Sequence, residues 1–107
     1  MANTFKRAEV KGNTTRQLAY TAPSVLTSVM YGGEAANIDT TNKTQHLVTI
    51  EIQKVDTSYV ELLRDVPVPY GSTLKLPKFS LDTGEKIYVT SDAANIIQTV
   101  FNLIEIT

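Results

Sequence analysis

The sequence contains no cysteine and no tryptophan, and its one histidine is His46. Without cysteine there is no disulfide and no thiolate metal site, so a small domain must be held by its core or by neighbouring molecules. A zinc ion would depend on carboxylates, and we therefore predict no metal site and no cofactor. We expect His46 to be a surface or edge residue at the start of a strand.

The chain also lacks an excess of charge of either sign. Ten Lys and Arg residues against 11 Asp and Glu residues give a net charge of −1. Proteins that bind nucleic acid by neutralising phosphates carry a clear basic excess, so we predict no nucleic-acid partner. Copies of a near-neutral protein repel one another weakly, which suits assembly.

Long apolar runs are missing as well. No run approaches the ~20 residues of a membrane-spanning helix, and the first residues contain no apolar segment of a secretory signal. We therefore expect no membrane partner. Of the 107 residues, 42% are hydrophobic and 20% are charged, which is typical of a globular protein with one domain.

Motifs that carry catalysis are also missing. No serine lies in a G-x-S-x-G context, and Gly32-Gly33 is not followed by the Lys and Ser/Thr of a phosphate-binding loop. The loop carboxylates lack the regular spacing of a calcium loop. We predict a protein that is not an enzyme, with no catalytic residues and no small-molecule substrate.

Alternation of apolar and polar residues is the main feature present. In residues 46–54, Val48, Ile50 and Ile52 lie on one face and polar side chains on the other, which predicts a strand with one buried face. Further strands are predicted at residues 17–21, 25–36, 59–63, 66–68, 72–78, 86–90 and 96–107. About eight strands at this spacing predict an all-β, antiparallel β-sandwich over residues 17–107.

Glycine and proline mark turns and irregular positions. Pro69-Tyr70-Gly71 predicts a tight turn with a positive φ at the glycine and with Tyr70 pointing outward. A second such turn is predicted at Asp82-Thr83-Gly84, and Pro67 predicts either an edge strand or a broken ladder. Gly32-Gly33, inside a strand, predicts a bulge or a close backbone approach.

The apolar phase of the last strand slips near Leu103. Ile97 and Phe101 share one parity, whereas Ile104 and Ile106 share the other. Either a bulge near Leu103 or coverage of both faces by a neighbouring subunit would explain this pattern.

Residues 1–16 are polar and lean basic, with Phe5 and Val10 as the only sizeable apolar side chains after Met1. Two interpretations remain open, a poorly ordered terminus and an N-terminal arm that orders on a neighbouring subunit. On the second, Phe5, Val10 and the outward Tyr70 are the candidate interaction residues. The five tyrosines either half-bury on strands or form a carbohydrate- or protein-binding surface.

Several segments resemble the small β-sandwich structural proteins encoded in tailed-phage virion gene clusters. Members of that family often show Y-T-A-P, P-A-G-S-T-L, L-x-x-G-D-x-I-x-V and a closing L-E-I-T. The matching segments here are residues 20–23, 69–74, 81–89 and 103–107. Tyr70 replaces the small residue and Glu85 the Asp of the pattern, and the resemblance covers roughly residues 17–107.

The resemblance implies a non-enzymatic virion structural protein present in repeated copies. We expect a capsid decoration or cement protein that binds the assembled major capsid shell, forms a homo-oligomer and is located in the virion, assembled in the bacterial host cytoplasm. A neck or tail accessory subunit, bound to other virion proteins, is the alternative within this class. A carbohydrate- or receptor-binding module with the tyrosines as its platform is the alternative from another class.

Overall fold

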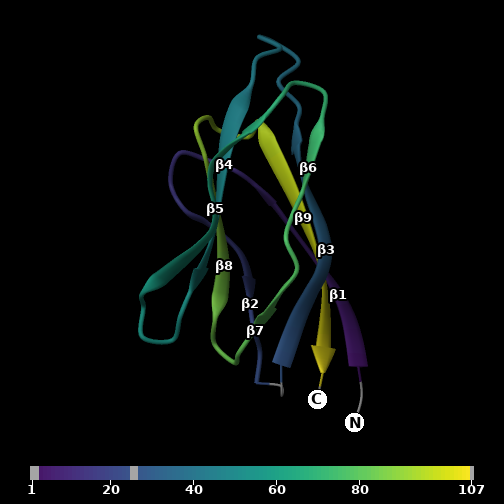
Figure 1. Cartoon of the computed structure of the whole chain (residues 1–107), viewed down its shortest axis with the longest axis vertical. Helices are drawn as coiled ribbons and strands as arrows, with labels where there is room; N and C mark the ends of the chain where they lie inside the picture. Colours follow the sequence, from purple (N-terminus) through teal and green to yellow (C-terminus); the bar gives the residue numbers. More distant parts are fainter. Residues whose placement is uncertain (1–2, 25–26, 107) are drawn as a thin grey trace.

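The computed structural model describes residues 3–24 and 27–106, which form nine strands and no helix, and hence none long enough to cross a membrane. Two antiparallel sheets lie against each other (Figure 1). The five-stranded sheet has the order β1 (Asn3–Lys11), β9 (Ile97–Ile106), β3 (Thr27–Asn37), β6 (Thr73–Lys75), with β7 (Phe79–Leu81) also paired to β3. The four-stranded sheet has the order β2 (Gln17–Thr21), β8 (Lys86–Ser91), β4 (His46–Gln53), β5 (Tyr59–Val68). The predicted all-β sandwich is confirmed.

The core lies between the two sheets and is built by the period-2 patterns of the strands. Met30 and Phe101 come from the five-stranded sheet, and Ile50 and Val89 come from the four-stranded sheet; all four are fully buried. Glu51 on β4, expected on the solvated face, is also buried. Among the described residues, every buried side-chain nitrogen or oxygen has a hydrogen-bond partner, so the interior carries no polar group that still requires a ligand.

The prediction of a bulge near Leu103 is wrong. Strand β9 alternates strictly between buried and partly exposed residues from Ile97 to Ile106. The register of the β3–β9 ladder shifts instead between Met30 and Gly32 on β3. The apparent slip arises because the outward positions of β9, such as Ile104 and Ile106, also carry apolar side chains.

The glycine pair gives both features predicted for it. The register shift beside Gly32 is a bulge, and at Gly33 an added Cβ would lie 2.5 Å from the Val100 carbonyl oxygen. An added Cβ at Gly32 would meet nothing within 4 Å. Neither glycine has a positive φ. The backbone therefore needs glycine at position 33 and does not need it at position 32.

The predicted boundary between an N-terminal arm at residues 1–16 and the sandwich at residues 17–107 is corrected, because β1 belongs to the five-stranded sheet. Asn3–Lys11 pairs with β9 along its whole length, with Asn3 opposite Ile106 and Lys11 opposite Gln98. The inward side chains of Ala8 and Val10 pack against the core. The outward face of β1 is exposed, which made a sheet strand look like a polar arm. Met1 and Ala2 lie outside the described residues.

Other boundaries move by smaller amounts. Residues 59–68 form one strand at the edge of the sheet, where Pro67 was predicted to lie. The strand predicted at 72–78 ends at Lys75, and Phe79–Leu81 is a strand that was not predicted. Residues 25–26, at the start of one predicted strand, lie outside the described residues. The two predicted turns are confirmed, with a φ of 75° at Gly71 and 87° at Gly84.

Candidate functional site

An apolar patch covers part of the outer face of the five-stranded sheet. In the register, Phe5 lies opposite Ile104, and Ile104 lies opposite Val29, so these outward side chains form a row across β1, β9 and β3. The Phe5 and Tyr31 rings meet edge to face with centroids 6.3 Å apart. We define the apolar patch as Phe5, Val29, Tyr31, Ile104 and Ile106. Phe5 is 68% exposed and Tyr31 is 41% exposed, although the sandwich already has a complete core.

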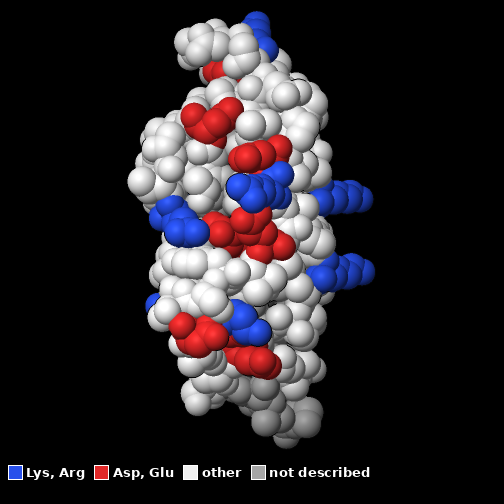
Figure 2. Space-filling model, turned by 60° about the vertical axis from the view of Figure 1, so that its left-hand side comes forward, with Lys and Arg blue, Asp and Glu red and all other residues white. Residues whose placement is uncertain are grey.

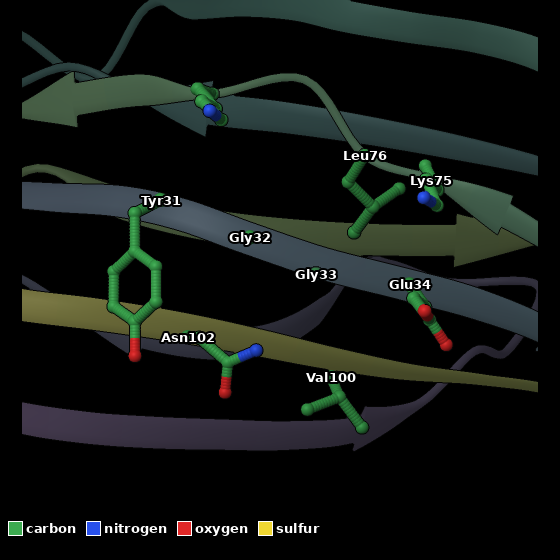
Figure 3. Close-up of a pocket in the computed structure, with 9 residues that line it drawn as sticks. Tyr31, Gly32, Gly33, Glu34, Lys75, Leu76, Val100 and Asn102 are labelled. Atoms are coloured by element: carbon green, nitrogen blue, oxygen red, sulfur yellow. The ribbon is translucent and has the colours of Figure 1, made fainter.

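A hollow of about 590 Å³ lies directly beside the patch, and we call it the glycine hollow. The hollow runs along the segment of β3 that contains Gly32 and Gly33 (Figure 3). Tyr31 and Glu34 flank the glycines on β3, and Asn102 and Val100 line the side formed by β9. On the other side it is lined by Leu76, Lys75 and Lys78. The bulge places Tyr31 and Gly32 at consecutive outward positions, so a large ring stands next to an empty position.

The three candidate residues from the sequence do not form one site. Phe5 and Val10 face opposite sides of β1, because they are an odd number of residues apart on one strand. Val10 is half-buried on the core, and its carbonyl accepts a hydrogen bond from the Thr99 hydroxyl at 2.8 Å. Tyr70 is 42% exposed in the turn between β5 and β6. Phe5 alone belongs to the apolar patch.

A second cluster surrounds His46 and was not predicted. Its Nε2 lies 2.8 Å from Asp39 Oδ2, and its Nδ1 lies 2.8 Å from Asp92 Oδ1. Ionised carboxylates only accept hydrogen bonds, so this geometry requires a proton on both ring nitrogens. We call these three residues the His46 clasp. The His46 side chain is 13% exposed, less than the surface position expected from the sequence.

The clasp ties two loops to the start of β4. Asp39 is buried and also accepts hydrogen bonds from the Asn42 backbone N–H at 3.0 Å and from the Thr44 hydroxyl at 2.9 Å. The Asn42 N–H and then His46 hold the pKa of Asp39 well below its usual range. The hydrogen bond to Asp39 raises the pKa of His46 above 6.5 against the opposing effect of burial, and Asp92 adds to the rise. The arrangement is a structural ion cluster with its donors and acceptors matched.

These directions predict a pH dependence of stability. A raised His46 pKa stabilises the fold below the unfolded value of about 6.5, and the contribution is lost as pH rises through the folded value. A lowered Asp39 pKa stabilises the fold above about 3.9, and that contribution is lost as pH falls. We expect the melting temperature of the wild type to exceed that of His46→Gln most at about pH 5 and less at about pH 8, measured by circular dichroism.

A gap between the two proteins that is equal at both pH values would contradict a charged clasp. Gln45→Asn, a neutral change at the neighbouring exposed residue, serves as the control and should give a gap that does not vary with pH.

The four-stranded sheet carries an ion pair between Arg16 and Glu51. Arg16 Nε and Nη2 donate to the two carboxylate oxygens of Glu51 at 3.0 and 3.3 Å. The Arg16 guanidinium also lies 3.8 Å from the centroid of the Tyr59 ring. Figure 2 shows acidic and basic side chains interleaved along one side of the molecule. On this face, charges of both signs lie close together (Figure 2).

The described residues contain no group of three or more His, Asp or Glu side chains arranged to hold a metal ion. The apolar patch and the glycine hollow are the candidate functional site, because they combine exposed aromatic side chains with a recess beside them. The sequence carried two signals for the patch, the apolar Phe5 in a polar segment and the apolar residues on both parities of the last strand. It carried no signal that Tyr31 would meet Phe5, because that contact depends on the bulge and on the pairing of β1.

Comparison with known proteins gives a fold and no family. No protein-family model matches the chain, and no curated protein matches it. Among solved structures, the chain is similar to a protein of Bacillus endospore appendages, described as a novel family of disulfide-linked pili. The TM-score is 0.58 at 13% sequence identity, over 98% of this chain and 87% of that chain. At this identity the similarity shows a shared small β-rich fold.

Proposed function

We propose that this protein is a non-enzymatic structural subunit of a tailed-phage virion, where it decorates the capsid and binds the assembled shell. The observation that carries the proposal is the apolar patch, which leaves Phe5 68% exposed on the outer face of a sandwich with a full core. Contiguous exposed apolar surface on a small protein marks a surface that another molecule covers.

Strand β9 supports this use of the face. Its inward side chains fill the core, and its outward positions include Val100, Ile104 and Ile106. Strands that are apolar on both faces are typical of sheets covered on both sides. In the single chain one of those sides faces solvent, so a partner would complete the burial.

The structural similarity supports assembly in general terms. The Bacillus protein belongs to pili that are linked by disulfides, whereas the present chain has no cysteine. Copies of this chain therefore cannot be linked by disulfides, and burial of apolar surface is a driving force available for their assembly. The tailed-phage part of the proposal rests on the sequence resemblance, and the absence of cysteine suits assembly in a reducing bacterial cytoplasm.

Quantitative mass spectrometry of purified particles from the source that encodes the chain tests the proposal. We expect the protein in every particle at a copy number close to that of the major capsid protein, and on the outer shell in a particle map. A much smaller copy number would assign it to the neck or tail. Absence from purified particles would overturn the proposal, as would turnover in esterase, glycosidase, peptidase or nuclease assays that is lost in His46→Gln.

A further inference from the structure

The apolar patch and the glycine hollow lie side by side on one face and have opposite shapes. Phe5 and Tyr31 form an exposed aromatic pair, and Tyr31 is also the first residue of β3 that lines the hollow, which continues along the strand at Gly32. Figure 3 shows the Tyr31 ring at one end of the hollow, with Asn102 between it and Val100. A contact between two identical surfaces requires a projection and a matching recess on the same surface.

The fold does not account for glycine at position 32. Its φ is not positive, and an added Cβ would meet nothing within 4 Å. Glycine inside a strand costs about 0.5–1 kcal/mol relative to alanine, and it often marks a place where a ligand or another chain approaches closely. The missing side chain at this position is what leaves the hollow open beside Tyr31.

Charge at this face permits the approach of a second copy. Arg7 and Glu9, outward on β1 beside the patch, form an ion pair with each other at 2.9 Å. At the hollow, Glu34 lies opposite Lys75 in the register of β3 and β6. Each copy therefore presents both signs rather than one, and the net charge of the chain is −1. The hollow itself is lined by two lysines, Lys75 and Lys78, and by one glutamate, Glu34, so a second copy has to meet this basic excess with an acidic group such as Glu9.

We infer that two copies of this chain pack through the apolar patch, with the Phe5–Tyr31 pair of each copy seated in the glycine hollow of the other. The inference rests on the proposed function, since it names the first partner that such a structural subunit binds through the patch. A two-fold axis between the patch and the hollow brings each pair over the partner's hollow. The outward apolar residues of β9 are then covered without any new segment of chain.

Sedimentation velocity of the full chain over a range of concentrations tests the inference. We expect a reversible monomer–dimer equilibrium for the wild type. Phe5→Ser removes part of the projection and Gly32→Leu fills the recess, and each should weaken dimerisation by at least about tenfold. Leu18→Ser is the matched control, because Leu18 is 49% exposed on β2 of the other sheet, and it should dimerise like the wild type. Unfolding curves confirm that each variant folds.

Disulfide trapping gives a second measurement that does not depend on weakened binding. Because the native chain has no cysteine, a copy carrying Phe5→Cys can be mixed with a size-tagged copy carrying Gly32→Cys and oxidised. We expect a cross-linked mixed dimer, and no such product when Leu18→Cys replaces Phe5→Cys.

A wild-type protein that stays monomeric at all concentrations would overturn the inference, as would wild-type dimerisation of Gly32→Leu. Glycan-array binding by the wild type that is lost in Tyr31→Ala would assign the hollow to a sugar and would also overturn it. A monomer in solution that is nevertheless found on purified capsids would refute the dimer and leave the proposed function standing. A protein that dimerises in solution but is absent from purified particles would support the dimer and refute the proposed function.

Discussion

Gly33→Ala is expected to lower the free energy of unfolding by about 2–3 kcal/mol, because the new Cβ would lie 2.5 Å from the backbone oxygen of Val100. The oxygen belongs to a paired strand, so neither side can move without disturbing the β3–β9 ladder. Urea unfolding followed by circular dichroism measures the change. If the dependence of the unfolding free energy on urea concentration is unaltered, the substitution has changed stability and not the surface exposed on unfolding.

Gly32→Ala, one residue earlier, is the matched control, and it should change the free energy of unfolding in the opposite direction. The added methyl group meets nothing, and alanine restricts the unfolded chain more than glycine does. In dilute solution we expect no loss of stability and a gain of up to about 1 kcal/mol. Equal losses at both positions would show that the two glycines serve the fold in the same way, contrary to the geometry.

Tyr20→Phe is expected to destabilise the fold by about 1.5–3 kcal/mol, the range for a hydrogen bond to a charged group. The Tyr20 hydroxyl donates to Glu105 Oε2 at 2.6 Å and lies 3.1 Å from Ser28 Oγ. It comes from the four-stranded sheet, whereas Glu105 and Ser28 lie on β9 and β3, so the contact joins the two layers. Without the hydroxyl, the carboxylate of Glu105 stays buried with one donor fewer.

The hydrogen bond between Tyr20 and Glu105 also predicts how the stability of the fold changes at high pH. Burial, and then the hydrogen bond to Glu105, raise the pKa of Tyr20 to about 12. A raised tyrosine pKa stabilises the fold below the unfolded value of about 10, and the contribution is lost as pH rises towards the folded value. The difference in unfolding free energy between wild type and Tyr20→Phe should therefore narrow at about pH 11.

Tyr70→Phe is the control for both measurements, because its hydroxyl lies on an exposed turn. It should change stability by less than about 0.5 kcal/mol at either pH. A Tyr20→Phe protein as stable as this control would mean that the carboxylate is adequately hydrated without the tyrosine.

The features that the sequence predicted well depend on neighbours along the chain. Alternation placed Val48, Ile50 and Ile52 in the core, and local turn chemistry placed Gly71 and Gly84 at positive φ. A turn needs only its own few residues to be recognised. The same holds for the bulge at the glycine pair, which was predicted as one of two possibilities.

The features that the sequence missed depend on partners far away in the chain. Polar β1 is a strand because β9, about 90 residues later, offers it a free edge. The His46 clasp needs Asp92, 46 residues away, and no spacing rule links the two. The contact between Phe5 and Tyr31 requires two such long-range features, the pairing of β1 with β9 and the bulge in the β3–β9 ladder.

The place of β9 in the sheet determines when the five-stranded sheet can form. It lies between β1 and β3, yet every other strand precedes it in the chain (Figure 1). Until β9 has been synthesised, β1 has none of its pairing in the described sheet, and β3 has only the short strands β6 and β7. Pairing across such separations is slow and exposes unpaired edges in the meantime. The five-stranded sheet can therefore close only after β9 has left the ribosome, so β1 and β3 wait for the strand that joins them.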